Sequence, residues 1–327
     1  MKMIDFMQIS VTAFSSCLAI FAILVNHLNF ARGLLTILGA GATYNYAGLE
    51  TPWWSYKDSI KSIVIEAGIT AIGDGTFQSL TNLEQVSMPS TVTSIGGHAF
   101  VGCSSLASIT IPSTVTFIGE GAFHGCDKLS FFTVLSGNQI YCSIDGVLFS
   151  KDGKTLLQYP YAKSNSYTIP NGVTSIGRYA FVHAPSLTSV AIPSNVTSIN
   201  YCAFCDCYAL TKVTYYGTID PGDSSSYIFY DCYNLYCLLV PPSYTSNTFC
   251  GHSVVKGNAC PAPTPTASRS PSRSPMATRS RSPMATPSKS PTASPSNKFT
   301  APVDYFQRKL KMNTIAVYQV LYHTFML

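Results

Sequence analysis

The sequence has few charged residues. Asp, Glu, Lys and Arg make up 11% of the 327 residues, about half the share of an ordinary globular protein, whereas hydrophobic residues make up 46%. A chain with this balance is neither mostly disordered nor of the histone or ribosomal type. Tryptophan is also scarce, with 2 residues, while Gly (22), Pro (20) and Tyr (20) are plentiful. This composition favours turns and short strands.

The basic excess lies outside the central part of the chain. The formal net charge is +5, yet residues 32–260 hold ten Lys or Arg and thirteen Asp or Glu, a balance of −3. Residues 261–298 hold six basic residues and no acidic one. The central part is therefore mildly acidic, and we expect this folded domain not to bind nucleic acid.

Apolar residues recur with a period of 23. The step holds from Phe77 to Phe100 to Phe123, and again from Phe181 to Phe204. The 58 residues between Phe123 and Phe181 equal one repeat of 23 plus an insertion of 35. A unit of this length cannot enclose a core alone, so its apolar face must be buried by neighbours stacked on both sides. The period therefore predicts a solenoid.

The apolar pattern within a repeat predicts short strands. Ile109 and Ile111 alternate as on a strand, and the following Pro112 ends its hydrogen-bond ladder. Val115 and Ile118 point inward from a second extended piece. The spacing Leu-x-x-Ile-x-Ile matches the strand half of a leucine-rich repeat. We expect a β-dominated, right-handed leucine-rich-repeat solenoid with short helical turns, one inserted β-hairpin and a disordered tail rich in Pro, Ser and Arg.

Several segments resemble a known family. The repeats PSTVTSIGGHAFVGCSSL, IPSTVTFIGEGAFHGCDKL and IPNGVTSIGRYAFVHAPSL resemble the BspA-like leucine-rich repeat family. The segment SIDGVLFSKDGKTLLQYP is similar to the hairpin that often interrupts these arrays. The resemblance extends from about Gly33 to Gly251. It implies a cell-surface protein that binds host or matrix proteins and other cells.

The chain divides into six segments. Residues 1–30 are apolar, most strongly over Val11–Val25, which suits a signal peptide or signal anchor better than a membrane span of about 20 residues. Residues 9–28 are accordingly the candidate for membrane attachment. The other segments are an amino-terminal strand and cap (31–66), the solenoid (67–243, with the hairpin insertion at about 135–169), a carboxyl-terminal cap (244–260), a disordered Pro/Ser/Thr/Arg linker or stalk (261–298) and a tail without an assigned role (299–327).

Two compartments stay open. Outside the cell, residues 261–298 would form an O-glycosylated stalk, and Asn195, in the triplet Asn-Val-Thr, would be a glycosylation site. Inside the cell, the Ser-Pro pairs of the same segment would be phosphorylated, and the protein would be an interaction scaffold. We expect an extracellular or cell-surface location, with the cytoplasm as the alternative.

The repeat register separates the cysteines into groups. One repeat position holds a cysteine in four turns and Leu80 or Ala184 in others, so these four are expected to pack in the core. They are Cys103, Cys126, Cys207 and Cys232. Cys202, Cys205 and Cys207 resemble half a zinc site, but the sequence offers no second cluster at ligand spacing, and we predict no metal.

Three cysteines near the proposed cap lie outside the core register. They are Cys237, Cys250 and Cys260, and they predict a cap disulfide. Two pairings are open, Cys250 with Cys260 or Cys237 with Cys250.

The sequence favours binding over catalysis. His124, Cys126 and Asp127 are adjacent in sequence, whereas a catalytic triad needs groups that converge in space. We therefore predict no enzymatic activity and no cofactor. We expect the strand side of the solenoid to bind a protein or surface ligand through aromatic side chains outside the core register. The candidates are Phe131, Phe132, Tyr215, Tyr216 and Tyr236.

Overall fold

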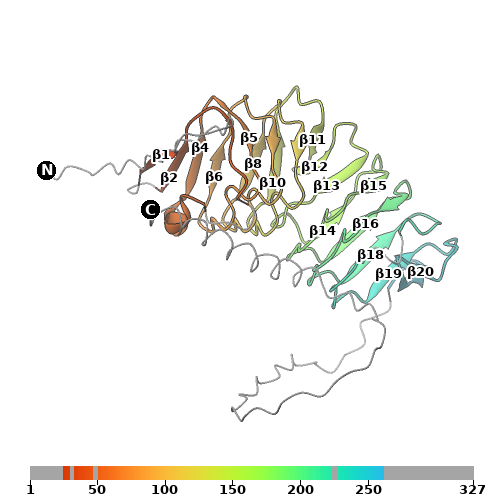
Figure 1. The fold of residues 1–327 in the computed structure, drawn as a ribbon. Helices are drawn as coiled ribbons and strands as arrows, with labels where there is room; N and C mark the ends of the chain where they lie inside the picture. The colour runs from red at the N-terminus through yellow and green to blue at the C-terminus, as the bar shows by residue number, and fades with distance from the viewer. Residues whose placement is uncertain (1–24, 30–32, 47–50, 223–226, 261–327) are drawn as a thin grey trace, which may run out of the picture. The chain divides into compact units, whose positions relative to one another are not determined.

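Short strands stacked along one axis make up the part of the chain that the computed structural model describes, residues 25–29, 33–46, 51–222 and 227–260 (Figure 1). Within these ranges the only helix is η1, a 3-10 helix over Trp54–Ser59. The β-dominated solenoid with little helix is thus confirmed. No helix in these ranges is long and apolar enough to span a membrane. Residues 1–24, the 261–298 segment and the 299–327 tail lie outside the described residues.

Most turns contribute one strand to a first series of ladders and another, usually shorter, strand to a second (Figure 1). The outward side of the first series is called the strand face below. The first series consists of β1 (Val25–Asn29), β2 (Leu34–Ile37), β4 (Ser62–Ile65), β6 (Gln85–Ser87), β8 (Ser108–Ile111), β10 (Phe131–Val134), β14 (Ser166–Thr168), β16 (Ser189–Ile192), β18 (Lys212–Tyr215), β19 (Cys237–Val240) and β22 (Val255–Lys256). The second consists of β3 (Gly41–Ala42), β5 (Ile69–Ile72), β7 (Ser94–Ile95), β9 (Phe117–Ile118), β11 (Tyr141–Ile144), β12 (Val147–Ser150), β13 (Thr155–Gln158), β15 (Ser175–Ile176) and β17 (Ser198–Ile199).

The 23-residue period is the register of the parallel ladders. Ser62 in β4 pairs with Gln85 in β6, and Ser94 in β7 pairs with Phe117 in β9, each 23 residues on. Because strand side chains alternate, a constant register places the same repeat position on the same face in every turn. The inward isoleucines, such as Ile109 of β8, therefore stack into a continuous core.

A column of aromatic rings runs through this core. Trp53, Phe77, Phe100 and Phe123 stack with ring centroids 5.3–5.6 Å apart. Each of the three phenylalanines is at most 2% exposed. Burial of such a ring stabilises the fold by about 1.5–3 kcal/mol, and a stacked pair adds about 0.5–1.5 kcal/mol. The column explains why phenylalanine marks the repeat so regularly.

Each turn bends through two residues with left-handed backbone angles, four positions apart. In one turn they are Gly121 and Gly125, and in a later one Tyr179 and His183, with φ of +57° and +54°. Only glycine adopts this region without steric cost, so the non-glycine residues are strained there. Neighbouring turns hold that strain in place through their hydrogen bonds.

The insertion is a three-stranded meander rather than a single hairpin. β11, β12 and β13 pair antiparallel through turns at Asp145-Gly146 and Asp152-Gly153. β13 then joins β15 in parallel, with Leu156 opposite Ile176. The insertion thus returns the chain to the second series of ladders, whereas the first series is interrupted between β10 and β14.

β12 separates the core into two clusters. Leu148 packs in the cluster that contains Phe123, while Val147 and Phe149 pack in the cluster that contains Phe181. These first three of the four residues of β12 are buried. The alternation of one strand therefore seals two cores at once.

A single side chain ties the insertion to the preceding turn. Asn138 is fully buried, and its side-chain amide donates to the carbonyls of Pro112 and Val115, both at 2.9 Å. Its side-chain carbonyl accepts from the amides of Ile140 (2.9 Å) and Tyr141 (2.8 Å). Four hydrogen bonds satisfy this buried polar group, so it acts as the joint between array and insertion.

Both ends of the array carry an additional edge strand. β1 pairs antiparallel with β2 at the amino-terminal end, so Val25–Asn29, which the sequence analysis placed in the apolar leader segment, forms an edge strand. At the other end β22 pairs in parallel with β19. A small hairpin of β20 (Thr248–Phe249) and β21 (His252–Ser253) lies before β22.

Candidate functional site

The five aromatic candidates divide between the surface and the core. Phe131, Tyr216 and Tyr236 are 47%, 59% and 49% exposed. Phe132 and Tyr215 are buried, so their placement on the binding surface was wrong.

Strand alternation is the reason for both errors. In β10 the outward Phe131 is followed by the inward Phe132. Tyr215 is likewise an inward residue of β18, and its hydroxyl, 3.0 Å from the carbonyls of both Val196 and Ile219, shares its one proton between these acceptors. Both aromatic side chains therefore pack in the core.

Apart from Phe131, many of the outward side chains of the strand face are short and carry hydroxyl groups. Phe131 lies opposite Ser108 of β8, next to which Thr110 also points outward. The aromatic ring therefore projects from a surface of short polar side chains. The outward Ser and Thr residues of the described first-series strands from β2 on are Thr36, Ser62, Ser87, Ser108, Thr110, Thr133, Ser166, Thr168, Ser189 and Thr214.

Phe131 borders a shallow depression of about 590 Å³ between β10 and the insertion. Lys163 and Asp145 form an ion pair there with an N–O distance of 3.0 Å. Ser143 donates from its hydroxyl to the Phe132 carbonyl at 2.6 Å, and the Phe132 amide donates to the Gly146 carbonyl at 2.8 Å. The insertion thus covers part of the free edge of β10 and places a charged pair beside an exposed ring. The sequence analysis missed Lys163 and Asp145, because they come together only through the meander.

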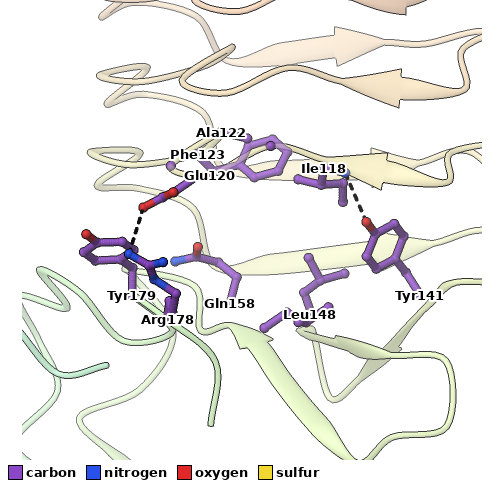
Figure 2. Close-up of a pocket in the computed structure, with 12 residues that line it drawn as sticks. Ile118, Glu120, Ala122, Phe123, Tyr141, Leu148, Gln158, Arg178 and Tyr179 are labelled. Carbon is purple, nitrogen blue, oxygen red and sulfur yellow. Dashed lines mark hydrogen bonds and ion pairs between the residues drawn. The ribbon is translucent and has the colours of Figure 1, made fainter. Parts of the chain in front are cut away.

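A second hollow, of about 300 Å³, lies where the second series passes from β9 to the insertion (Figure 2). Ile118–Phe123 form one wall, and Leu157, Gln158, Arg178 and Tyr179 form the other. Tyr141 and Leu148 complete the apolar lining. We call this hollow the rung cleft.

Polar groups surround the rung cleft on two sides (Figure 2). The Ile118 amide donates to the Tyr141 hydroxyl at 3.0 Å, and burial raises the pKa of that phenol. Glu120 and Arg178 face each other across the mouth at 3.9 Å. Their side chains are 60% and 59% exposed, so this pair contributes little to stability. Arg178 also lies over the Tyr179 ring, 5.7 Å from its centroid.

The four cysteines at the shared repeat position are core residues, as predicted. Cys103, Cys126 and Cys207 are buried, and Cys232 is partly buried against the same core. Each thiol donates to a phenylalanine carbonyl of the preceding turn; for Cys103 and Phe77 the distance is 3.2 Å. Burial raises the pKa of Cys103 to about 12. The Cys103 thiol therefore remains protonated and unreactive at neutral pH.

Cys202 and Cys205 form a disulfide, which the sequence analysis did not predict. In the described ranges no group of three His, Cys, Asp or Glu residues is placed to hold a metal ion. Cys207, the third member of the zinc-like pattern, packs in the core. The C-x-x-C spacing was the available signal, since Cys202 and Cys205 both fall outside the core position.

The cap disulfide joins Cys237 to Cys260, so both pairings proposed from the sequence were wrong. The segment after β22 folds back, with the Gly257 amide donating to the Val240 carbonyl at 3.1 Å, and this brings Cys260 beside the start of β19. Cys250 is instead a buried free thiol, and its amide donates to the Asp220 carboxylate at 3.0 Å. The sequence does not reveal this reversal of the chain.

Asn195 is exposed in the turn after β16, and its side-chain amide donates to the Asn171 carbonyl at 2.7 Å. Its glycosylation stays a prediction. The Ser-Pro pairs of 261–298 lie outside the described residues.

Two histidines from different turns stack beside the insertion. The rings of His124 and His183 lie 6.3 Å apart. Burial, and then the proximity of His183, lowers the pKa of His124. Under them lies Tyr161, whose buried hydroxyl has no hydrogen-bond partner among the described residues.

Comparison with known proteins finds one matching family. A family model described as a BspA type leucine rich repeat region, in six copies, matches residues 53–152 and 154–256. No curated protein matches the chain significantly.

Several solved structures are similar to the chain. A leucine-rich repeat protein from Eubacterium ventriosum is 26% identical, with 68% of this chain and 80% of that chain covered and a TM-score of 0.43. A leucine rich cell surface protein from Faecalibacterium prausnitzii is 28% identical, with 61% and 60% covered and a TM-score of 0.46. The pneumococcal vaccine antigen PcpA is 22% identical, with 56% and 51% covered and a TM-score of 0.45.

Proposed function

The chain belongs to the BspA type leucine-rich repeat family, and from this premise we propose that it is a non-enzymatic binding module. It binds a protein or surface ligand through the strand face of the solenoid. An array of stacked turns presents an extended surface, so affinity comes from contacts across several repeats.

One observation carries this proposal. Phe131 is a large apolar side chain, 47% exposed, surrounded by hydroxyl groups and next to the Lys163–Asp145 pair. Interfaces concentrate their binding energy in a few aromatic or Arg anchors surrounded by a polar rim. We infer that Phe131 is the anchor and that the depression beside it receives the ligand. Tyr216 and Tyr236, exposed directly after β18 and directly before β19, are proposed as further contacts.

We also propose an extracellular or cell-surface location. The pairs Cys202–Cys205 and Cys237–Cys260 support it, because disulfides persist in oxidising compartments. A cytoplasmic scaffold with a phosphorylated Arg-Ser-Pro tail, the alternative, would keep these four cysteines as thiols. Peptide mapping of the protein from its native source decides between them. Two disulfides with a glycan on Asn195 support export, whereas free thiols with phosphorylated Ser-Pro sites contradict it.

The binding proposal is tested with matched phenylalanine variants of the full chain. Binding is measured to a panel of immobilised matrix proteins, namely fibrinogen, fibronectin, laminin and collagen. Phe131→Ala should weaken binding at least about tenfold, the effect of losing one anchor side chain. Phe117→Ala is the control, because Phe117 is 57% exposed but lies in β9 of the second series. Equal binding by both variants and the parent chain would contradict the proposal.

A further inference from the structure

Neighbouring turns of the solenoid are joined by a repeated row of backbone hydrogen bonds. The amides of Gly75 and Phe77 donate to the carbonyls of Gly97 (2.9 Å) and Ala99 (2.8 Å) of the next turn. The same bonds recur one turn later, where Phe100 donates to Ala122 at 2.8 Å, and again after the insertion. Each turn thus offers amides on one side and carbonyls on the other.

This row is interrupted at the rung cleft. Gly121 and Phe123 occupy the next donor positions, but in the described part of the chain their amides donate to no carbonyl. On the opposite wall the Arg178 carbonyl, at the position of Gly97, accepts no hydrogen bond from the described residues. The insertion supplies only one such bond, from the Tyr159 amide to the Ala180 carbonyl at 2.7 Å. Two amide donors and one carbonyl acceptor of the repeated row therefore have no backbone partner among the described residues at the rung cleft.

The fold covers the adjacent edge position with a side chain. The Tyr141 hydroxyl accepts from the Ile118 amide, so the end of β9 is closed. The next two donors toward the mouth, at Gly121 and Phe123, have no such cover. They line a hollow whose volume of about 300 Å³ lies at the lower limit of ligand pockets. Its lining is mainly apolar, from Ala122, Phe123 and Leu148.

We propose that the rung cleft binds a peptide segment of a partner protein in the bent conformation of a regular turn. The segment's carbonyls accept from the Gly121 and Phe123 amides, and one of its amides donates to the Arg178 carbonyl, as a regular turn would. Small or apolar side chains fit the lining, and the opposed charges of Glu120 and Arg178 at the mouth favour a neutral segment. These three backbone groups lie in the bends between the two series of strands, so the bound segment completes a row of turn hydrogen bonds rather than adding a strand to a sheet. The inference is independent of the strand-face proposal.

The probe is a blocked synthetic peptide with the sequence of residues 93–102, TSIGGHAFVG, which contains the bend of one regular turn of this protein. Hydrogen exchange of individual amides is followed by NMR in the full chain. Without peptide, the Gly121 and Phe123 amides should exchange at least about tenfold faster than those of Phe100 and Phe181. Millimolar peptide should slow both by about tenfold, the effect of one added hydrogen bond each.

Two controls make the result specific. A peptide that is N-methylated at its His and Phe residues keeps the side chains but cannot donate to Arg178, and it should protect less. Gln158→Trp fills the cleft and should abolish protection, whereas Thr70→Trp, at an exposed position of β5 in another turn, should not. If Gln158→Trp does not fold, the comparison of the two peptides decides.

Three results would overturn the proposal. One is that millimolar peptide leaves both amides unprotected. Another is equal protection by the N-methylated peptide. The third is protection that grows with the concentration of the chain alone, which would identify a second copy as the occupant. Phe131→Ala should leave peptide protection unchanged, which separates this site from the strand face.

Discussion

The regular turns and the insertion satisfy their backbone hydrogen bonds and fill their core in different ways. In a regular turn, a neighbour on each side supplies hydrogen bonds and an aromatic ring, as for Phe100 between Phe77 and Phe123. At the insertion one neighbour is missing, and individual side chains take over. Asn138 satisfies four backbone groups, and the hydroxyl of Tyr141 covers one edge amide. In the regular turns, stability thus comes from contacts that recur at the same repeat position. In the insertion it depends on a few individual residues.

Phe100→Ala removes one ring from the aromatic column of the regular turns and should have the largest effect on stability. The ring is fully buried between two others, so its removal leaves a cavity that neighbouring turns cannot close. We expect a loss of about 3–5 kcal/mol in the free energy of unfolding. Urea unfolding of the full chain measures it. A loss below about 1 kcal/mol would show that the column is not a main source of stability.

Cys260→Ser tests the carboxyl-terminal end, where a covalent bond replaces the missing neighbour. The disulfide to Cys237 closes a separation of 23 residues, and its loss should cost about 3 kcal/mol in free energy of unfolding. Unfolding under non-reducing conditions measures this loss. Dithiothreitol should lower the stability of the parent chain more than that of the variant. Equal sensitivity of the two proteins to the reductant would contradict the role of this bond.

Asn138→Ala tests the joint at the start of the insertion. The substitution leaves the buried amide of Tyr141 and the partly buried amide of Ile140 without their acceptor, which should cost about 2–3 kcal/mol. Asn171→Ala is the control, because Asn171 is an exposed asparagine in a turn of the array. Hydrogen exchange should also rise first within residues 138–150. Uniform acceleration over the whole array would contradict a local joint.

The smallest effect we expect is a dependence on pH. Burial lowers the pKa of His124 in the folded state, with further lowering from His183 and His98 and opposite contributions from Asp206 and Asp127. As the pH falls below about 6.5, the unfolded state takes up the proton first, so stability decreases. Unfolding at pH 5 and pH 8 measures the difference. His124→Gln should reduce it, and an unchanged difference would assign the dependence to other groups.

The regular turns were predictable because each repeat position has one role. The recurrence of Phe77, Phe100 and Phe123 indicated the register of the ladders, and the substitution of cysteine for Leu80 indicated a core position. The alternation of Phe131 and Phe132 was also predictable, because neighbouring residues of a strand point to opposite faces, so only one of the two rings can lie on the surface.

The insertion and the cap were less predictable because nothing in them repeats. The segment SIDGVLFSKDGKTLLQYP indicated one hairpin, whereas the structure has a third strand. Only the three-dimensional path places Lys163 beside Asp145. The pairing of Cys237 with Cys260 likewise depends on a chain reversal after β22. Residues far apart in sequence without a shared period give no signal of their contact.

The burial of both faces of β12 has a mechanical consequence. Leu148 belongs to one core, and Val147 and Phe149 belong to the other, so the two halves of the array share one thin internal wall. A pulling force applied along the axis would cross the regular turns through paired strands of one or both series, whereas at the insertion neither β9 with β11 nor β10 with β14 is paired. We expect the array to part there first under tension, leaving two shorter stacks, each with its own core. The insertion then sets the load at which the chain begins to lengthen.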